Sequence, residues 1–176
     1  MNSTIDIRPE EPDDIADIHC VVHAAFGRDL EAELVVALRC SNGFVPELSL
    51  VAVMDDKIAG HVMITTVEIA GDSGTLTMST ILAPLSVTPA YQHRGIGGAL
   101  MRDALGRPHD RGYTSVVLVG HPGYYPRFGF QPASTWGIRY PSPVPDEVFM
   151  AIELVPGALR GSAGTIILPD AFQEIR

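Results

Sequence analysis

The segment YQHRGIGGAL (residues 91–100) places three glycines, a histidine and an arginine where a helix is predicted to begin. Glycine lowers helix stability, so its repetition here needs another explanation. The first turn of a helix leaves backbone N–H groups unpaired and carries partial positive charge, and it therefore binds anions. Without side chains, the glycines let a bulky diphosphate approach this backbone, while His93 and Arg94 add donors. The segment predicts an anion site.

Two familiar nucleotide-binding patterns are excluded by the surrounding residues. A Walker loop needs Lys-Ser or Lys-Thr after its glycines, and neither follows here. A dinucleotide fingerprint needs Gly or Ala in its sixth position, where this chain has Leu100. A glycine-rich helix start that only packs closely on a sheet stays open as an alternative from this segment alone.

Two motifs together resemble the GNAT superfamily of N-acetyltransferases. Gln92-x-x-Gly95-x-Gly97 follows LSVTPAY and resembles the acyl-coenzyme A (CoA) motif of that superfamily. About 30 residues later, YYPRFGF (124–130) resembles its Y-x-x-x-G-F element, with Tyr125 in the first position. The form VGHPGYYPRFGF, with FMAIELVPGAL after it, is similar to the YhbS-type predicted acetyltransferases over residues 5–172. The chain is thus identified as a member of the superfamily.

The resemblance implies a site for the acyl-CoA arm between two diverging parallel strands that end at Val87 and Val119. Backbone groups of the first strand would bind the pantetheine amides, and an N–H near Leu85 would polarise the thioester carbonyl. Pro84 is consistent with this, because a bulge there frees backbone donors. The implied cofactor-binding residues are Leu85, Ser86, Val87, Gln92, His93, Arg94, Gly95, Ile96, Gly97 and Gly98.

The resemblance also implies that Tyr125 is the general acid that protonates the departing thiolate. Tyr124 is the less suitable donor, because adjacent rings cannot both face the thiol. A general base is harder to identify, since LTMSTILAPLSV (76–87) contains no carboxylate. His121 is a candidate base, with a structural hydrogen bond before Pro122 as the alternative; Glu68 or an ordered water would be substitutes.

The implied function is acetyl transfer from acetyl-CoA, as acyl donor, to an amine by direct attack in a ternary complex. The acceptor, a small molecule or a protein amine, is not defined by the sequence. We expect it to contact the first two helices and loops near 43–47 and 134–146, with Phe44, Trp136 and Arg139 as candidate contacts. His61 is predicted to be packed or to line the acceptor site.

A non-catalytic acyl-CoA binding or sensing module is the alternative function. It would keep residues 92–98 and lose the chemistry, and the missing carboxylate on the strand before the motif favours it. Tyr125 counts against it, because a binding module has no use for a proton donor at the thiol.

The predicted helices and strands that position these residues indicate a mixed α/β (α+β) fold, with a largely antiparallel sheet that contains one parallel pair of strands. Hydrophobic periodicity predicts helices from near Pro12 to Phe26, over 30–39 and from Ile96 onward. Alternation predicts a hairpin turning at residues 55–57, a strand bulged at Pro84 and a buried strand at YTSVVLVG. Later strands are predicted at FMAIELVPG and 164–168. We expect one domain over residues 1–176, with 156–176 as an added strand and tail.

Composition narrows the function classes further. With 12 basic and 21 acidic residues the formal charge is −9, which disfavours nucleic acid. No apolar run reaches the length of a membrane span, and the start lacks the pattern of a secretory signal. Cys20 and Cys40 have no metal or redox spacing; we expect them buried, no metal site, and a cytoplasmic protein. A homodimer through the 164–168 edge is also expected.

Overall fold

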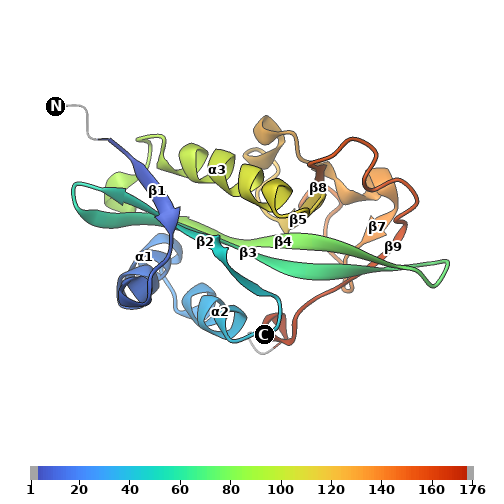
Figure 1. Ribbon diagram of the computed structural model, residues 1–176, viewed down its shortest axis with the longest axis horizontal. Coiled ribbons are helices and arrows are strands. Elements are labelled where there is room, and N and C mark those ends of the chain that lie inside the picture. The colour runs from blue at the N-terminus through green and yellow to red at the C-terminus, as the bar shows by residue number, and fades with distance from the viewer. Residues whose placement is uncertain (1–3, 174–176) are drawn as a thin grey trace.

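A mixed β-sheet runs through the molecule, with α3 (Ile96–Asp110) on one face and α1 (Ile15–Phe26) and α2 (Leu30–Arg39) on the other (Figure 1). The computed structural model describes residues 4–173. The strands are β1 (Asp6–Pro9), β2 (Phe44–Met54), β3 (Lys57–Gly71), β4 (Leu76–Val87), β5 (Ser115–Val119), β6 (Gln131–Pro132), β7 (Ile138–Arg139), β8 (Phe149–Glu153) and β9 (Gly164–Ile167). The expected fold class is confirmed; the two-residue strands β6 and β7 were not expected.

The sheet order is β1-β2-β3-β4-β5-β8-β6, and β9 joins β3 and β7. Neighbouring strands of the sheet are antiparallel, apart from the parallel pairs β4–β5 and β7–β9. The β2–β3 hairpin turns at Asp55 and Asp56, which both have positive φ. The bulge expected at Pro84 is present, because the β3–β4 register shifts between Val62 and Ile64. The sequence-based strand and turn predictions therefore hold through the centre of the sheet.

The β4–α3–β5 unit places the glycine-rich segment at one end of the parallel pair. Helix α3 lies close to the sheet because Gly60 on β3 leaves room for it: a Cβ there would lie 2.9 Å from Leu100 Cδ1 and 3.0 Å from Ile96 Cγ2. Ile96 and Leu100 are almost completely buried. This packing fixes the first turn of α3 against the sheet.

Several local expectations are wrong. Cys20 and Cys40 are exposed rather than buried. Cys20 lies off the buried face of α1, and Cys40 follows the last residue of α2 as its C-cap. Ile15 and Phe26 share the helical spacing of the apolar residues, which predicts that they are buried, but both are exposed (41% each), because the buried face of α1 passes through Ile18, Val21 and Val22 instead. Periodicity located this helix but misplaced the ends of its buried face.

A buried polar network lies beneath α1 and α2. The Glu10 carboxylate accepts hydrogen bonds from Arg39 Nε (2.6 Å) and Ser49 Oγ (2.5 Å). Ser49 Oγ also contacts His61 Nε2 at 2.9 Å. Burial alone would raise the pKa of Glu10, but its hydrogen bonds with His61, Arg39 and Ser49 outweigh burial and lower the pKa to about 2. Burial lowers the pKa of His61, so its ring is neutral.

We predict that Glu10→Gln lowers the free energy of unfolding at pH 7 by about 3 kcal/mol, because it leaves the Arg39 charge unpaired and largely buried. Because the pKa of Glu10 lies below its ordinary value, the ionised carboxylate stabilises the fold at any pH above that ordinary value. This stabilisation is lost as the pH falls through about 2. The deficit of the variant should therefore shrink between pH 4.5 and pH 2 in urea titrations. Glu147→Gln at an exposed position is the control. A deficit that is constant with pH would contradict this account.

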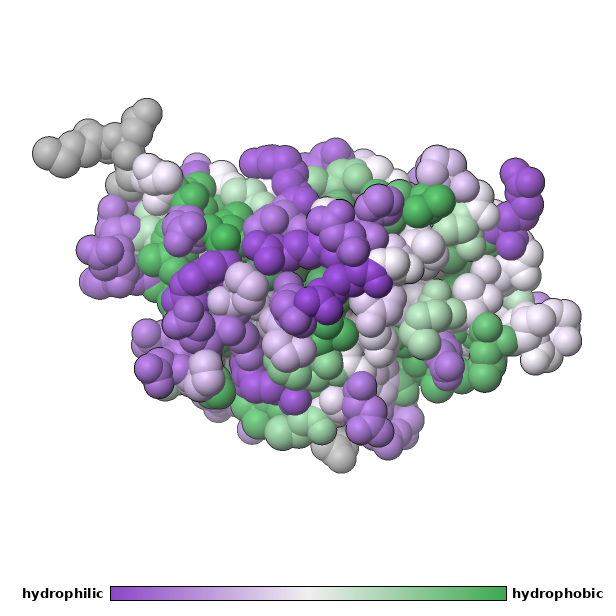
Figure 2. Space-filling view, in the orientation of Figure 1, coloured by the Kyte–Doolittle hydropathy of each residue, from purple (hydrophilic) through white to green (hydrophobic). Residues whose placement is uncertain are grey.

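Hydrophilic side chains dominate the middle of the face seen in Figure 2, while hydrophobic groups show on both sides of it, beside β1 and toward the end where the β3–β4 hairpin projects. Leu76 and Met78 on β4 are exposed there. Between residues 4 and 173, no helix combines the length and the apolar composition needed to cross a membrane.

Candidate functional site

The glycine-rich turn forms one wall of a cavity of about 530 Å³, which we call the glycine-turn cavity. It lies between the end of β4, the first turn of α3 and the 3-10 turn Tyr125–Phe128 with the residue before it. Its lining residues are Leu85, Val87, Tyr91, Gln92, His93, Gly95, Ile96, Gly97, Gly98, Arg102, Tyr124, Arg127 and Phe128. The structure thus brings most of the predicted cofactor residues together.

The first turn of α3 has the geometry of an anion site. Gly95 is its N-cap in the left-handed conformation (φ 84°) and accepts the N–H of Ala99 at 3.0 Å. The N–H groups that follow Gly95 have no intrahelical acceptor. A Cβ on Gly95 would meet no atom within 4 Å, whereas one on Gly97 would lie 2.9 Å from the Tyr124 hydroxyl oxygen. Backbone conformation therefore requires glycine at position 95, and close approach requires it at position 97.

The cations of this cavity differ from those expected. Arg94 lies over the Tyr91 ring, 5.1 Å from its centroid, and does not line the cavity. Arg102 and Arg127 line it instead, and no carboxylate among residues 4–173 does. Arg127 is held by its Nε, which donates to the Tyr124 carbonyl at 2.9 Å. A chain of net charge −9 thus has a locally cationic cavity.

We predict that Gly95→Ala lowers CoA affinity at least tenfold, because alanine disfavours the φ of 84° that directs the first-turn N–H groups. The same strain should lower the free energy of unfolding by about 1 kcal/mol. Gly74→Ala is a matched control, since Gly74 has the same φ and an equally open Cβ position in the β3–β4 turn. Calorimetric titration with CoA and urea unfolding measure both effects. Equal loss of affinity in both variants would contradict the assignment.

A second cavity, of about 620 Å³, lies where β4 and β5 part, and we call it the strand-gap cavity. The two strands are in register only at Thr80–Val116 and Ile81–Val117. The closed end is held by hydrogen bonds from Thr80 Oγ1 to the Ser115 carbonyl (2.9 Å) and between the hydroxyls of Ser79 and Ser115 (2.7 Å). Beyond Ile81 the β5-facing edge of β4 has no partner strand in the described part of the chain.

The strand-gap cavity adjoins the glycine-turn cavity, because Leu85 and Tyr124 line both. Its lining residues are Phe26, Glu31, Leu34, Ile81, Leu82, Ala83, Pro84, Leu85, Val119, Gly120, His121, Tyr124, Tyr125, Tyr140 and Phe172. The two cavities therefore lie side by side at the end of β4, with the two arginines lining one, and Tyr125 and residues of α1 and α2 lining the other.

Tyr125 is a polar group of this cavity whose ring is fixed by aromatic contacts. Its ring makes edge contacts with Tyr124 and Phe130, at centroid distances of 5.1 and 6.0 Å. Gly120 provides space for it, since a Cβ there would lie 2.3 Å from Tyr125 Cε2. Burial raises the pKa of Tyr125 to about 12, so the phenol is protonated at neutral pH. No group of residues 4–173 hydrogen-bonds to its hydroxyl, which leaves it available to a ligand.

His121 also lines the strand-gap cavity, but its ring is already used locally. Its Nδ1 accepts the backbone N–H of Gly123 at 3.1 Å. In the neutral ring this assigns the proton to Nε2, which makes that nitrogen a donor. The hydrogen bond agrees with the structural alternative considered for His121, and a base role would require that bond to break.

Three further candidates lie outside both cavities. Ser86 is buried, and its hydroxyl donates to the His61 carbonyl at 3.3 Å, so only its backbone is available to a cofactor. His61 is fully buried in the polar network and does not line the acceptor site. Glu68 lines a different groove and is not a substitute base, because it pairs in register with Met78 and Ile167 far along β3.

The structure places the candidate acceptor contacts Phe44, Trp136 and Arg139 in three different surroundings. Phe44 packs with the α1–α2 core, Trp136 packs on a second core cluster, and Arg139 pairs with Asp72 at 2.5 Å. None of the three lines the strand-gap cavity. The first two helices and the 134–146 loop line this cavity through other residues, Phe26, Glu31, Leu34 and Tyr140.

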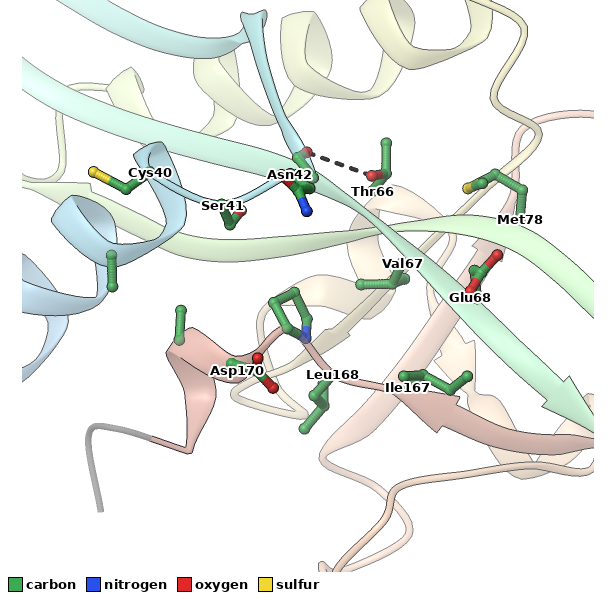
Figure 3. A pocket seen from close by; sticks show the side chains of 14 residues that line it. Cys40, Ser41, Asn42, Thr66, Val67, Glu68, Met78, Ile167, Leu168 and Asp170 are labelled. Carbon is green, nitrogen blue, oxygen red and sulfur yellow. Dashed lines mark hydrogen bonds between the residues drawn. The ribbon is translucent and has the colours of Figure 1, made fainter.

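Figure 3 shows the groove that contains Glu68, which we call the α2 groove. It has a volume of about 630 Å³ and lies between the end of α2, the middle of β3 and residues 167–171. Asp170 and Leu168 are on this side of the C-terminal segment, whereas Phe172 lines the strand-gap cavity. The 3-10 turn Asp170–Phe172 thus separates the two spaces.

Comparison with known proteins gives a consistent result. A family profile for the acetyltransferase (GNAT) domain matches residues 6–133. The chain is 40% identical over 135 residues to the uncharacterized N-acetyltransferase YjhQ of Escherichia coli, covering 76% of this chain and 74% of that protein. It is 33% identical over 169 residues to the uncharacterized N-acetyltransferase YhbS of the same organism, covering 96% and 98%.

Two solved structures resemble this one over nearly the whole chain. The first is Escherichia coli YhbS in complex with CoA, with a TM-score of 0.90 and 29% identity, covering 98% of this chain and 94% of that one. The second is a GNAT family acetyltransferase from Brucella melitensis in complex with acetyl-CoA, with a TM-score of 0.77 and 33% identity, covering 96% and 98%.

Proposed function

Since the chain belongs to the GNAT family of N-acetyltransferases, we propose that its two adjoining cavities hold acetyl-CoA and a primary amine together. The acetyl group is transferred directly between them in a ternary complex. The observation that carries this proposal is the opening between β4 and β5 after Ile81, into which both cavities lead.

Acetyl-CoA occupies the glycine-turn cavity and the edge of β4. Its diphosphate accepts hydrogen bonds from the first-turn N–H groups of α3, with Arg102 and Arg127 beside it. The pantetheine amides pair with backbone groups of residues 85–87, which β5 does not cover. This arrangement brings the thioester to the junction at Leu85 and Tyr124, next to Tyr125. The complexes of YhbS with CoA and of the Brucella protein with acetyl-CoA support the choice of donor.

The reaction forms one C–N bond and breaks one C–S bond. The neutral amine attacks the thioester carbonyl carbon, and the resulting oxyanion is stabilised by a backbone N–H near Leu85. As the C–S bond breaks, the Tyr125 hydroxyl protonates the thiolate, and the nitrogen loses a proton that restores the phenol through water. Burial that raises the Tyr125 pKa also raises that of a thiol in the same cavity, so the proton transfer remains feasible.

His121 is a candidate for the group that receives the proton of the amine nitrogen. While Nδ1 accepts from the Gly123 N–H, the Nε2 of the neutral ring is a donor. Water that is exchanged through the open cavity serves the same purpose without breaking that bond. We therefore assign the base role to water first and to His121 second.

The experiment that tests this function measures free thiol release from acetyl-CoA across a panel of amines, peptides and aminoglycosides. We expect amine-dependent thiol release with a matching acetylated product by mass spectrometry. Tight binding of acetyl-CoA without turnover of any amine would instead indicate a non-catalytic acyl-CoA sensor.

Three further properties belong to this proposal. We propose one acetyltransferase domain over the chain, and a cytoplasmic setting that suits its two free, exposed cysteines. We also propose a homodimer, although β9 offers less edge than expected: β3 pairs with one side and β7 covers Gly164 and Thr165 on the other. Only Ile166 and Ile167 remain for edge pairing, and light scattering tests the oligomeric state.

A further inference from the structure

The acceptor side of the strand-gap cavity is lined by rings and aliphatic groups from four separate parts of the chain. Phe26 ends α1, Leu34 lies in α2, Tyr140 follows β7, and Phe172 ends the C-terminal 3-10 turn. Tyr125 and Pro84 face the same space from the catalytic side. Residues so distant in sequence converge here to make a largely apolar chamber.

Phe26 gives the clearest indication that this lining serves a ligand. It is 41% exposed at the end of an otherwise amphipathic helix, although burial of a phenylalanine side chain stabilises a fold by about 2 kcal/mol. Its ring lines the cavity instead of joining the core. An apolar group bound in the cavity would cover this ring.

The charges of the cavity exclude other classes of acceptor. No Lys or Arg among residues 4–173 lines it, so it offers no cation to a substrate carboxylate. Its single carboxylate in that range is Glu31, whose two oxygens already accept from Arg28 Nε at 3.1 and 3.0 Å. A polyamine or an aminoglycoside, which needs several acceptors for its positive charges, would find one carboxylate that is already paired.

An apolar chamber also explains how the reaction could proceed without a carboxylate base. A buried ammonium loses solvation, which lowers its pKa and favours the neutral amine. The neutral amine is the nucleophile, so the chamber reduces the need for a carboxylate base, which β4 lacks.

From these observations we infer that the acceptor is a primary amine on an uncharged, apolar body. The inference rests on the proposed acetyl transfer and deepens it by naming the acceptor class. Phe26 and Phe172 are its specificity-determining residues. Phe172 lines the chamber from the C-terminal 3-10 turn, whose residues Asp170 and Ala171 line the α2 groove.

The test compares kcat/KM for 2-phenylethylamine with values for spermidine, lysine, kanamycin and a peptide with a free N-terminus. We expect 2-phenylethylamine to be preferred at least tenfold over each. Phe26→Asp should lower its kcat/KM at least tenfold and leave CoA affinity within twofold. The control is Val36→Asp, because Val36 is a similarly exposed apolar helix residue (47%) outside the cavity.

A second variant tests the chamber wall. Phe172→Ala should raise kcat/KM for 4-phenylbutylamine relative to 2-phenylethylamine at least fivefold, because the chamber then extends toward the α2 groove. CoA affinity serves as the folding control for this variant.

The outcomes distinguish failure of the inferred acceptor class from failure of the proposed acetyl transfer. Preferential acetylation of a polyamine, amino acid or peptide would overturn the acceptor class and leave acetyl transfer intact. A Phe26→Asp variant that retains full preference for 2-phenylethylamine would also overturn it. Absence of thiol release with every amine, in protein that binds CoA, would overturn the proposed function and this inference with it.

Discussion

Tyr125→Phe should lower kcat by about 10- to 1000-fold and leave the CoA dissociation constant within twofold. Loss of general acid catalysis has an effect of this size, and the substitution removes one oxygen atom that no group of residues 4–173 hydrogen-bonds. The ring contacts with Tyr124 and Phe130 are retained, so we expect little change in stability. Steady-state thiol release and calorimetric titration with CoA measure the two quantities.

The matched control is Tyr124→Phe, which tests the adjacent hydroxyl at the junction of the cavities. We expect its effect on kcat to be several-fold smaller than that of Tyr125→Phe. The raised pKa of Tyr125, about 12, also predicts that the wild-type enzyme shows no loss of turnover from phenol ionisation up to about pH 11. A larger defect in Tyr124→Phe would transfer the acid role to that residue.

Gly120→Ala should produce a comparable loss of turnover without altering any polar group. The new Cβ would lie 2.3 Å from Tyr125 Cε2 and 2.9 Å from Cδ2, so the ring must move from its place beside the thioester. Displacement of a catalytic group by about 1 Å costs on the order of 100-fold in rate. Stability should fall by about 1–3 kcal/mol from overpacking.

Gly106→Ala is the control for this variant, since a Cβ at that position on α3 meets no atom within 4 Å. It should leave kcat unchanged and stabilise the helix slightly. If Gly120→Ala retains wild-type kcat, then the position of the Tyr125 ring is not important for catalysis, and the acid assignment loses its geometric support.

Local sequence signals were sufficient for the elements that carry the site. The glycine-rich turn predicts both a helix start and an anion site. Gly95 adopts the left-handed backbone conformation, which few other residues adopt without strain. The bulge at Pro84 followed from the missing N–H of proline. Together they predict the β4–α3–β5 unit, whereas the opening between its strands was implied by the family resemblance.

The directions of the arginine side chains near the anion site were harder to predict from the sequence. Arg94 was expected at the anion, but it follows His93, whose positive φ (62°) is not readable from its residue type, and it stacks on Tyr91. Arg102 was overlooked, although its spacing four residues after Gly98 places both on one side of α3. That spacing was a usable signal.

The side chains that line the strand-gap cavity could not be derived from the sequence, although two of the segments that supply them were expected near the acceptor. Phe26 and Phe172 are separated by most of the chain and meet only through the packing of α1 and the C-terminal turn around the β4–β5 opening. Periodicity assigned Phe26 to the core because apolar residues at helical spacing usually belong there. Tertiary structure, and not local pattern, assigns it to the cavity.

The most direct test of the central claim is an experimental structure of the chain with CoA bound. The account predicts the pantetheine arm between β4 and β5, the diphosphate on the first-turn N–H groups of α3, and the thiol sulfur within about 4 Å of the Tyr125 hydroxyl oxygen, hydrogen-bonding distance for sulfur. CoA bound outside the β4–β5 opening, or a thiol directed away from Tyr125, would contradict it.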